Sequence, residues 1–290
     1  MIFEEKFAHI FQVSEDGVHT YKAASLDLGY GRLFGGQILS QAFLSAAKTV
    51  DDTRVCHSLH SYFLRMGHAH LPVRYVVEYV RDGKSFSNRR VKAWQEDVCL
   101  FVMSASFQVV EGDAVRSESW KREPKKPEDL ISDQVWIEKN KNYLSDRVLK
   151  FWTQPSVFEQ RSEERLSFCD AIVSESEWAT WFRLKGGTQL SGLSTQVMQQ
   201  ALFLWYSDMM ILIPALKPHG VTYGNAPFRM ASLDHSVWFH QPLCLEEWQL
   251  YELSSSFQGG GRTLCHGKVF SRSSCLLATV SQEAFMRDSL

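Results

Sequence analysis

The chain carries one arrangement twice, and this repetition limits its possible folds more than any other feature. In each half, a strongly apolar helical segment precedes a series of strand-like segments. His60 and Gln108 lie 48 residues apart in the first half, and His235 and Gln282 lie 47 residues apart in the second. Each histidine is followed by a serine, and a glycine-containing turn lies within each interval. A repeated unit of this kind predicts a duplicated α+β domain, with each helix wrapped by its own antiparallel sheet.

Both helical segments should be buried on most sides. Residues 37–50 (QILSQAFLSAAKTV) and residues 193–212 (LSTQVMQQALFLWYSDMMIL) are apolar around nearly the whole helix. Steps of three and four residues place Asp208 on the same stripe as Ala201 and Leu204. A carboxylate on a buried stripe is costly unless it is paired, protonated or functional. The alternative is that Asp208 simply reaches solvent at the helix end.

The segments that follow the first helix have the pattern of an antiparallel meander. Residues 73–80 alternate in polarity, residues 81–84 (RDGK) predict a turn, and two further strands are expected at 86–94 and 100–108.

A polar stretch separates the two repeats. Residues 121–129 (KREPKKPED) combine charges with two prolines, which is typical of a surface connection. We therefore expect an N-terminal domain at 1–112, a polar connection at 113–165 and a C-terminal domain at 166–290.

Composition excludes several classes of protein. A net charge of -2 gives no electrostatic bias toward nucleic acid, and no apolar run is long enough for a membrane span. The six cysteines form no CxxC motif and the histidines no HExxH motif, so we expect neither a metal nor a cofactor. Reduced thiols and the absence of a leader peptide favour an intracellular protein.

Several longer motifs resemble those of the acyl-CoA thioesterase II family, the double-hotdog enzymes of bacteria and peroxisomes. They are 32–37 (RLFGGQ), 57–67 (HSLHSYFLRMG), 81–89 (RDGKSFSNR), 104–108 (SASFQ) and 232–240 (SLDHSVWFH). The resemblance covers both halves of the chain. It implies a hotdog fold in each half and the hydrolysis of acyl-CoA to free acid and CoA, with medium to long acyl chains as the expected substrates.

The resemblance also implies a catalytic trio at Asp208, Ser232 and Gln282. A thioester is already activated, so a water deprotonated by Asp208 suffices, while Ser232 and Gln282 hold that water in line. Alternation along 276–284 places Gln282 in an otherwise apolar row, as expected of an inward-facing residue. Simple alternation places Ser232 on the polar face, opposite Leu233, and a bulge or a strand covered on both faces would remove this conflict.

Candidate substrate-binding residues lie mainly near turns. Gly35, Gly36 and Gln37 begin the first helix, where free backbone N–H groups favour negative charge, although close packing at a tight turn explains the glycines equally well. His60 is a further candidate, although a histidine near a strand start usually has a structural role.

Four basic residues are candidates for the phosphates of CoA: Lys84, Arg89, Arg90 and Arg262. Scattered basic residues near turns are, however, usually only solvated.

Other functions fit the sequence less well. A serine-hydrolase triad of Ser232, Asp234 and His235 is disfavoured, because residues so close along one strand cannot form the required line. A hotdog hydratase typically needs a histidine five residues after its aspartate, and Ile213 stands there instead. A non-catalytic acyl-CoA binding module would not need the Asp208, Ser232 and Gln282 trio.

The resemblance leads to three further expectations. Residues 35–50 contain no carboxylate, so the chain should have one active site despite its two repeats. We expect a homo-oligomer, either a dimer or a tetramer. The C-terminal Asp288-Ser289-Leu290 departs from the Ser-Lys-Leu signal of peroxisomal members, which favours the cytoplasm.

Overall fold

The computed structural model describes most of the chain. The described residues are 3–29, 31–112, 114–120, 122–144, 146, 149, 153, 155–164, 173, 175–186, 188, 190, 192, 195–221 and 228–288. The chain forms two compact units, and neither is one continuous stretch of sequence. The first unit contains Met1–Arg116, Gln189–Met209 and Leu233–Leu243, and the second contains Ser117–Thr188, Met210–Ser232 and Cys244–Leu290.

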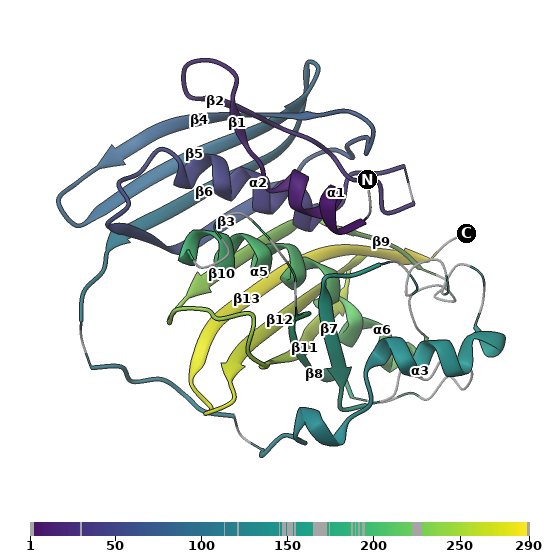
Figure 1. Ribbon diagram of the computed structural model, residues 1–290. Helices are drawn as coiled ribbons and strands as arrows, with labels where there is room; N and C mark the ends of the chain where they lie inside the picture. Colours follow the sequence, from purple (N-terminus) through teal and green to yellow (C-terminus); the bar gives the residue numbers. More distant parts are fainter. Residues whose placement is uncertain are drawn as a thin grey trace. The chain divides into compact units, whose positions relative to one another are not determined.

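The first unit is an antiparallel sheet that carries the long apolar helices. In spatial order its strands are β1 (Ser14–Glu15), β2 (Thr20–Ala23), β4 (Val73–Asp82), β5 (Phe86–Gln95), β6 (Val98–Val109), β3 (Arg54–Phe63) and β10 (Asp234–Phe239). Its helices are α1 (Phe3–Ile10), α2 (Gly35–Ala47) and α5 (Gln196–Met210). Helix α2 lies across the face of the sheet against β3, β4, β5 and β6 (Figure 1). The predicted meander is confirmed in β4, β5 and β6.

The second unit is a smaller antiparallel sheet with short helices. Its strands follow the order β9 (Phe228–Ser232), β13 (Leu276–Asp288), β12 (Arg262–Ser271), β11 (Gln249–Gly259), β8 (Glu177–Leu184) and β7 (Phe158–Ser162). The helical elements are η1 (Pro127–Asp129), α3 (Asp133–Asn140), η2 (Lys141–Tyr143), α6 (Ile213–Leu216) and η3 (Lys217–His219).

The expected polar connection packs on the sheet of the second unit. Asp133, the first residue of α3, accepts hydrogen bonds from the backbone N–H and the hydroxyl of Ser162 in β7. Trp120 packs on a cluster that includes Trp181 and Phe270. The expected connection, although rich in prolines and charges, therefore makes buried contacts of its own.

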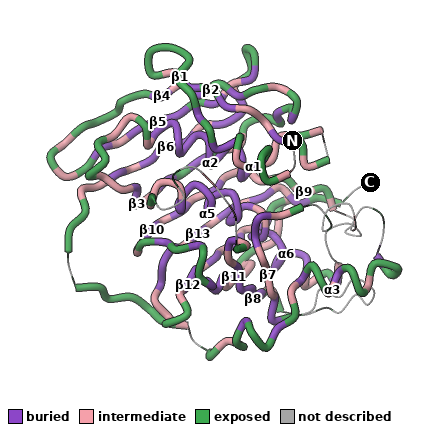
Figure 2. Tube along the Cα trace, in the orientation of Figure 1, coloured by how far each residue is buried: buried purple, intermediate pink, exposed green. Residues whose placement is uncertain are grey.

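Helix α2 is buried on all sides, as its composition predicts, and Gly36 to Ala46 are all buried (Figure 2). It begins two residues earlier than predicted and ends before Lys48. One side packs on the sheet and another meets α5, where the hydroxyl of Ser40 lies 2.8 Å from the carbonyl oxygen of Ala201. A helix placed between a sheet and a second helix has no side left for solvent.

The close approach of the two helices depends on Gly36. A Cβ atom built at Gly36 would lie 2.6 Å from the backbone carbonyl oxygen of Trp205 in α5. Real carbon atoms do not approach backbone oxygen so closely, so a methyl group here would push the helices apart. Gly36 is therefore required by helix packing.

We expect Gly36→Ala to lower the free energy of unfolding by about 2 kcal/mol, because overpacking at a backbone contact cannot relax through side-chain rotation. The matched control is Gly112→Ala, since a Cβ atom at Gly112 meets nothing within 4 Å. That control should stay within about 0.5 kcal/mol or gain slightly from the stiffer unfolded chain. Urea unfolding of both variants measures the difference, and equal stability would contradict the packing role of Gly36.

Candidate active site

Asp208 lies on the buried stripe of α5, in the last turn of that helix. Only 8% of the residue is exposed although α5 ends two residues later, at Met210. The alternative that Asp208 simply reaches solvent at a helix end is therefore wrong. A carboxylate in such surroundings requires a specific environment that favours it.

The start of helix α2 supplies part of that environment. A Cβ atom built at Gly35 would lie 2.5 Å from Oδ2 of Asp208 and 3.2 Å from the ring of Phe63. The carboxylate therefore lies directly against the first turn of α2, whose N-cap residue, Phe34, provides no side-chain cap. The positive end of a helix dipole is a favourable place for a negative charge.

Both glycines at the start of α2 allow a part of α5 to come close to α2. Gly35 leaves room for the carboxylate of Asp208, and Gly36 leaves room for the backbone of α5. The side chain of Gln37 is fully buried: its amide donates to the carbonyl of Ala24 and its oxygen accepts from the N–H of Leu26. Of Gly35, Gly36 and Gln37, only the backbone is left for contacts with a substrate.

A buried histidine anchors the turn of α5 that carries Asp208. His235 on β10 is completely buried, and its Nε2 lies 3.0 Å from the hydroxyl oxygen of Ser207. Its backbone carbonyl accepts a hydrogen bond from the hydroxyl of Ser61 on β3. The position of Ser207 next to Asp208 was the only sequence signal for this contact, and sequence analysis missed it.

Ser232 and Gln282 meet in the second unit. Gln282 lies on β13, is completely buried, and donates a hydrogen bond from Nε2 to the hydroxyl oxygen of Ser232 on β9 at 2.9 Å. The expected row is confirmed, because Ala278, Val280, Gln282 and Ala284 are all buried. A hydroxyl that accepts this bond keeps its own hydrogen for donation to another group.

The conflict in strand parity at Ser232 has a simple cause. The strand expected across residues 232–240 is interrupted at Leu233, between β9 and β10. Strand β9 pairs with β13 in the second unit, and β10 pairs with β3 in the first. Alternation cannot be continued across the interruption, so neither a bulge nor a strand covered on both faces is needed.

The hydrogen bonds of His235 and Ser232 argue against a serine-hydrolase triad. The Nε2 atom of His235 faces Ser207, and Ser232 Oγ accepts its hydrogen bond from Gln282.

His60 lies on an exposed part of β3. Its Nδ1 is 3.2 Å from the hydroxyl of Ser236, and its ring packs edge-on against Trp238. The two His-Ser motifs of the sequence repeat pair with each other in the sheet, because His60 is opposite Ser236 and His235 is opposite Ser61.

Arg89 has a structural role. It is only 2% exposed, and its five N–H groups donate to the hydroxyl and carbonyl of Thr49, the carbonyls of Arg81 and Asn88, and the carboxylate of Asp82. The hydrogen bonds of Asp82 from Ser87 and then Arg89 hold its pKa below the usual value. No donor remains for a phosphate, so the interpretation of Arg89 as a CoA ligand does not fit its contacts.

Arg262, in contrast, remains accessible. It lies at the start of β12, its side chain is half exposed, and Nε donates to Glu283 at 2.8 Å. Among the described residues this is the one ion pair of Arg262, which leaves the other N–H groups of the guanidinium open to an anion.

Metal binding and membrane insertion were also considered for the described residues. Within the described ranges, no group of three or more His, Cys, Asp and Glu side chains is arranged to hold a metal ion. None of the helices in the described part of the chain has the length and apolar character to span a bilayer.

Comparison with known families gives matches in both halves of the chain. A family described as acyl-CoA thioesterase matches residues 174–285, and one described as acyl-CoA thioesterase N-terminal domain matches residues 25–108. The chain is 31% identical to acyl-CoA thioesterase 2 of Haemophilus influenzae over 97% of this chain and 96% of that protein. It is 36% identical to acyl-coenzyme A thioesterase 8 of Mus musculus, over 88% and 80% of the two chains.

Solved structures agree with these matches. The crystal structure of the acyl-CoA thioesterase II TesB2 from Mycobacterium marinum superimposes with a TM-score of 0.77 at 30% identity, covering 97% of each chain. A protein from Alicyclobacillus acidocaldarius described as having a hotdog fold gives a TM-score of 0.76 at 15% identity, which concerns the fold alone. The predicted α+β double-hotdog fold is confirmed.

We expect Arg89→Lys to lower the free energy of unfolding by about 2 to 3 kcal/mol, because one ammonium cannot replace five fixed donors. The adjacent Arg90→Lys is the control, since Arg90 is half exposed and pairs with the exposed Glu78. That change should cost at most about 0.5 kcal/mol. Thermal unfolding monitored by circular dichroism compares them, and a stable Arg89→Lys protein would argue against the structural role.

Proposed function

Because the chain belongs to the acyl-CoA thioesterase family, we propose that it hydrolyses fatty acyl-CoA thioesters to free acids and CoA, with Asp208 as general base. One observation carries the assignment of Asp208: its carboxylate is buried on an apolar helix and lies against the glycine that begins α2. A charge in this position is costly for folding, so a role in chemistry accounts for its presence.

In the proposed reaction, a water molecule attacks the thioester carbonyl carbon while Asp208 accepts a proton from that water. The carbon–sulfur bond then breaks, the carboxylic acid is released, and the CoA sulfur takes up the proton. No covalent intermediate on the protein is required. General-base assistance of this kind contributes about 10²- to 10⁴-fold to a rate.

Ser232 and Gln282 are proposed to orient the attacking water. The hydrogen bond from Gln282 fixes the hydroxyl oxygen of Ser232, so that the hydroxyl hydrogen can be donated in a defined direction. Positioning of a reactant by such a pair lowers the entropic part of the barrier. The assignment of both residues rests on the family resemblance of their motifs and on their mutual contact.

Three of the substrate contacts expected from the sequence remain in the proposal: the backbone at the start of α2, His60 and Arg262. The backbone at Gly35 and Gly36 is proposed to contact the thioester carbonyl, because free N–H groups at a helix start stabilise developing negative charge. His60 stays a proposed contact for the substrate, and Arg262 stays a proposed contact for the phosphates of CoA. Medium to long acyl chains are the proposed substrates, since the rings of Phe63 and Phe34 lie beside these glycines.

We expect Asp208→Asn to lower kcat by about 10²- to 10⁴-fold, equivalent to about 3 to 5 kcal/mol of barrier, with KM little changed. Asparagine keeps the shape of the side chain and removes its capacity to accept the proton. Asp234→Asn is the matched control: it removes the acid that a serine-hydrolase triad would need, and should leave kcat within about twofold. Release of free CoA from dodecanoyl-CoA is the measurement. Normal turnover in Asp208→Asn, or a collapse in Asp234→Asn, would reject the proposed mechanism.

Ser232→Ala and Gln282→Ala should each lower kcat, and their effects should not be additive. Because Gln282 acts through the hydroxyl of Ser232, the double variant should lose less activity than the two single losses combined, with a coupling of about 1 kcal/mol. Steady-state kinetics of the four proteins in this cycle test the pair. Fully additive losses would show that the two residues act independently.

A further inference from the structure

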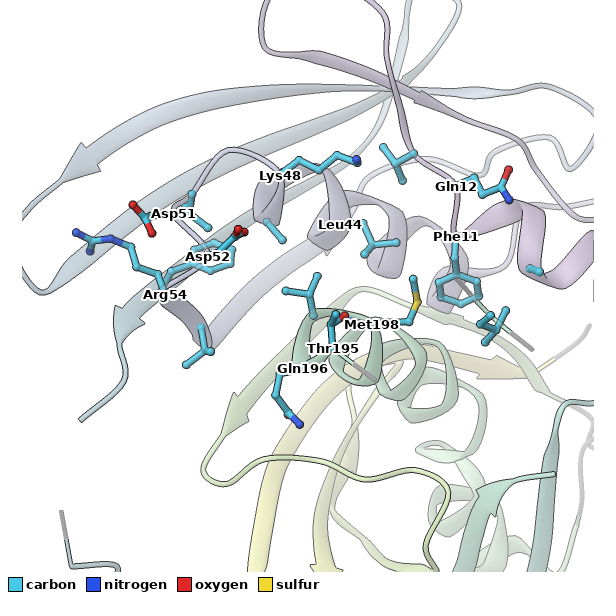
Figure 3. A pocket seen from close by; sticks show the side chains of 18 residues that line it. Phe11, Gln12, Leu44, Lys48, Asp51, Asp52, Arg54, Thr195, Gln196 and Met198 are labelled. Carbon is cyan, nitrogen blue, oxygen red and sulfur yellow. Dashed lines mark hydrogen bonds between the residues drawn. The ribbon is translucent and has the colours of Figure 1, made fainter. Parts of the chain in front are cut away.

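A pocket of about 700 Å³ lies within the first unit, at the ends of α2 and α5 that are remote from Asp208 (Figure 3). Met198, which lines the pocket, lies ten positions before Asp208 in α5, a helical distance of about 15 Å. Small-molecule sites typically measure about 300 to 1,000 Å³. The proposed reaction gives this space no role.

The pocket lies at a position of the α2–α5 helix pair that is equivalent to the position of Asp208 at its other end. Helices α2 and α5 run antiparallel, because Gly36 lies against Trp205 and Ser40 lies against Ala201. Near one end of the pair, the thirteenth residue of α5, Asp208, lies beside the first residue of α2, Gly35. At the other end, the thirteenth residue of α2, Ala47, lines the pocket together with the first residue of α5, Gln196.

This second position lacks the proposed base. Ala47 occupies the helical position that corresponds to Asp208, and α2 contains no carboxylate. The walls are mostly apolar and include Phe11, Leu44, Phe107 and Met198. Apolar walls around a pocket of this size suit an apolar ligand.

The charged residues that line the pocket are Lys48, Asp51, Asp52 and Arg54, and they fall into two groups. Asp51, Asp52 and Arg54 lie together at one side in Figure 3, whereas the side chain of Lys48 extends toward Gln12 at the other. Arg54 donates from Nη2 to the carbonyls of Gly83 and Lys84, while its Nη1 is buried without a hydrogen-bond partner among the described residues. Asp51 accepts from the backbone and hydroxyl of Thr53. Across the described ranges, Lys48 forms no ion pair with another residue.

We propose that this pocket binds the anion of a medium- to long-chain fatty acid without transforming it. The chain would lie against Phe11, Leu44 and Met198, and the carboxylate would pair with Lys48. A single negative charge can pair with Lys48, whereas the several phosphates of CoA would be repelled by Asp51 and Asp52. The inference rests on the proposed function only for the origin of the ligand, because a fatty acid is the product of that reaction.

Calorimetric titration of the full chain with dodecanoate tests the site. The protein is first saturated with dodecyl-CoA, a non-hydrolysable thioether that occupies the active site. We expect dodecanoate still to bind one site per chain. Ala47→Phe and Met198→Phe, which fill the pocket from different helices, should each weaken this binding at least tenfold, and thermal unfolding of both variants confirms that they are folded.

The charge is tested with Lys48→Met. This variant should bind dodecanoate about threefold more weakly, as expected for an exposed ion pair, while the affinity for uncharged dodecanol stays the same. Hydrolysis of dodecanoyl-CoA should remain within twofold of the parent in all three variants.

Loss of dodecanoate binding in the thioether-saturated protein would overturn the proposal, because the pocket would then belong to the acyl chain of the bound thioether. Binding that ignores both filling variants would also overturn it. This test and the test of the proposed function can fail separately. A protein that binds dodecanoate in this pocket but does not hydrolyse acyl-CoA would support the pocket and contradict the proposed function. A protein that hydrolyses acyl-CoA but does not bind dodecanoate would do the reverse.

Discussion

The backbone contact between α2 and α5 is the constraint on which the first unit depends. With no side chain at Gly36, the carbonyl of Trp205 can lie against α2, and the hydroxyl of Ser40 bridges the same two helices. The ring of Trp205 is then enclosed by Phe7 and Phe34, at centroid distances of 5.0 and 4.8 Å. Only at this separation can the side chain of Asp208 reach the first turn of α2. The environment of Asp208 is therefore set by the packing of α5 against α2 one and two helical turns earlier, at Trp205 and Ala201.

Much of this arrangement was readable from the sequence, because it is encoded in local periodicity. Apolar residues around the whole circumference of 37–50 predicted a helix without a solvent face, and the alternating row that contains Gln282 predicted its burial. Asp208 could be recognised as unusual because the same periodicity places its carboxylate on an otherwise apolar stripe. Pattern is most informative where one element has one environment along its length.

The remaining features depend on contacts that are distant in sequence. Strand parity failed at Ser232, because the chain changes its pairing partner at Leu233 while the sequence alternates as though one strand continued. Arg89 resembled other exposed basic residues, because nothing in its local sequence shows that Thr49 receives two of its donors. The two His-Ser motifs look equivalent, yet His60 is exposed and His235 is completely buried. Duplicated residues diverge in role once their neighbours differ.

The interruption at Leu233 has a consequence for how the protein is made. Strand β3 reaches its full set of hydrogen-bonded neighbours only when β10 arrives, which is encoded more than 170 residues later. During synthesis, the first unit must therefore wait with an open sheet edge and an uncovered apolar face on α2, until translation has passed Leu243. Such non-local closure slows folding and exposes strand edges that pair readily with other chains. The two repeats are therefore not independent modules: a cut between them would yield two fragments, neither with a complete core.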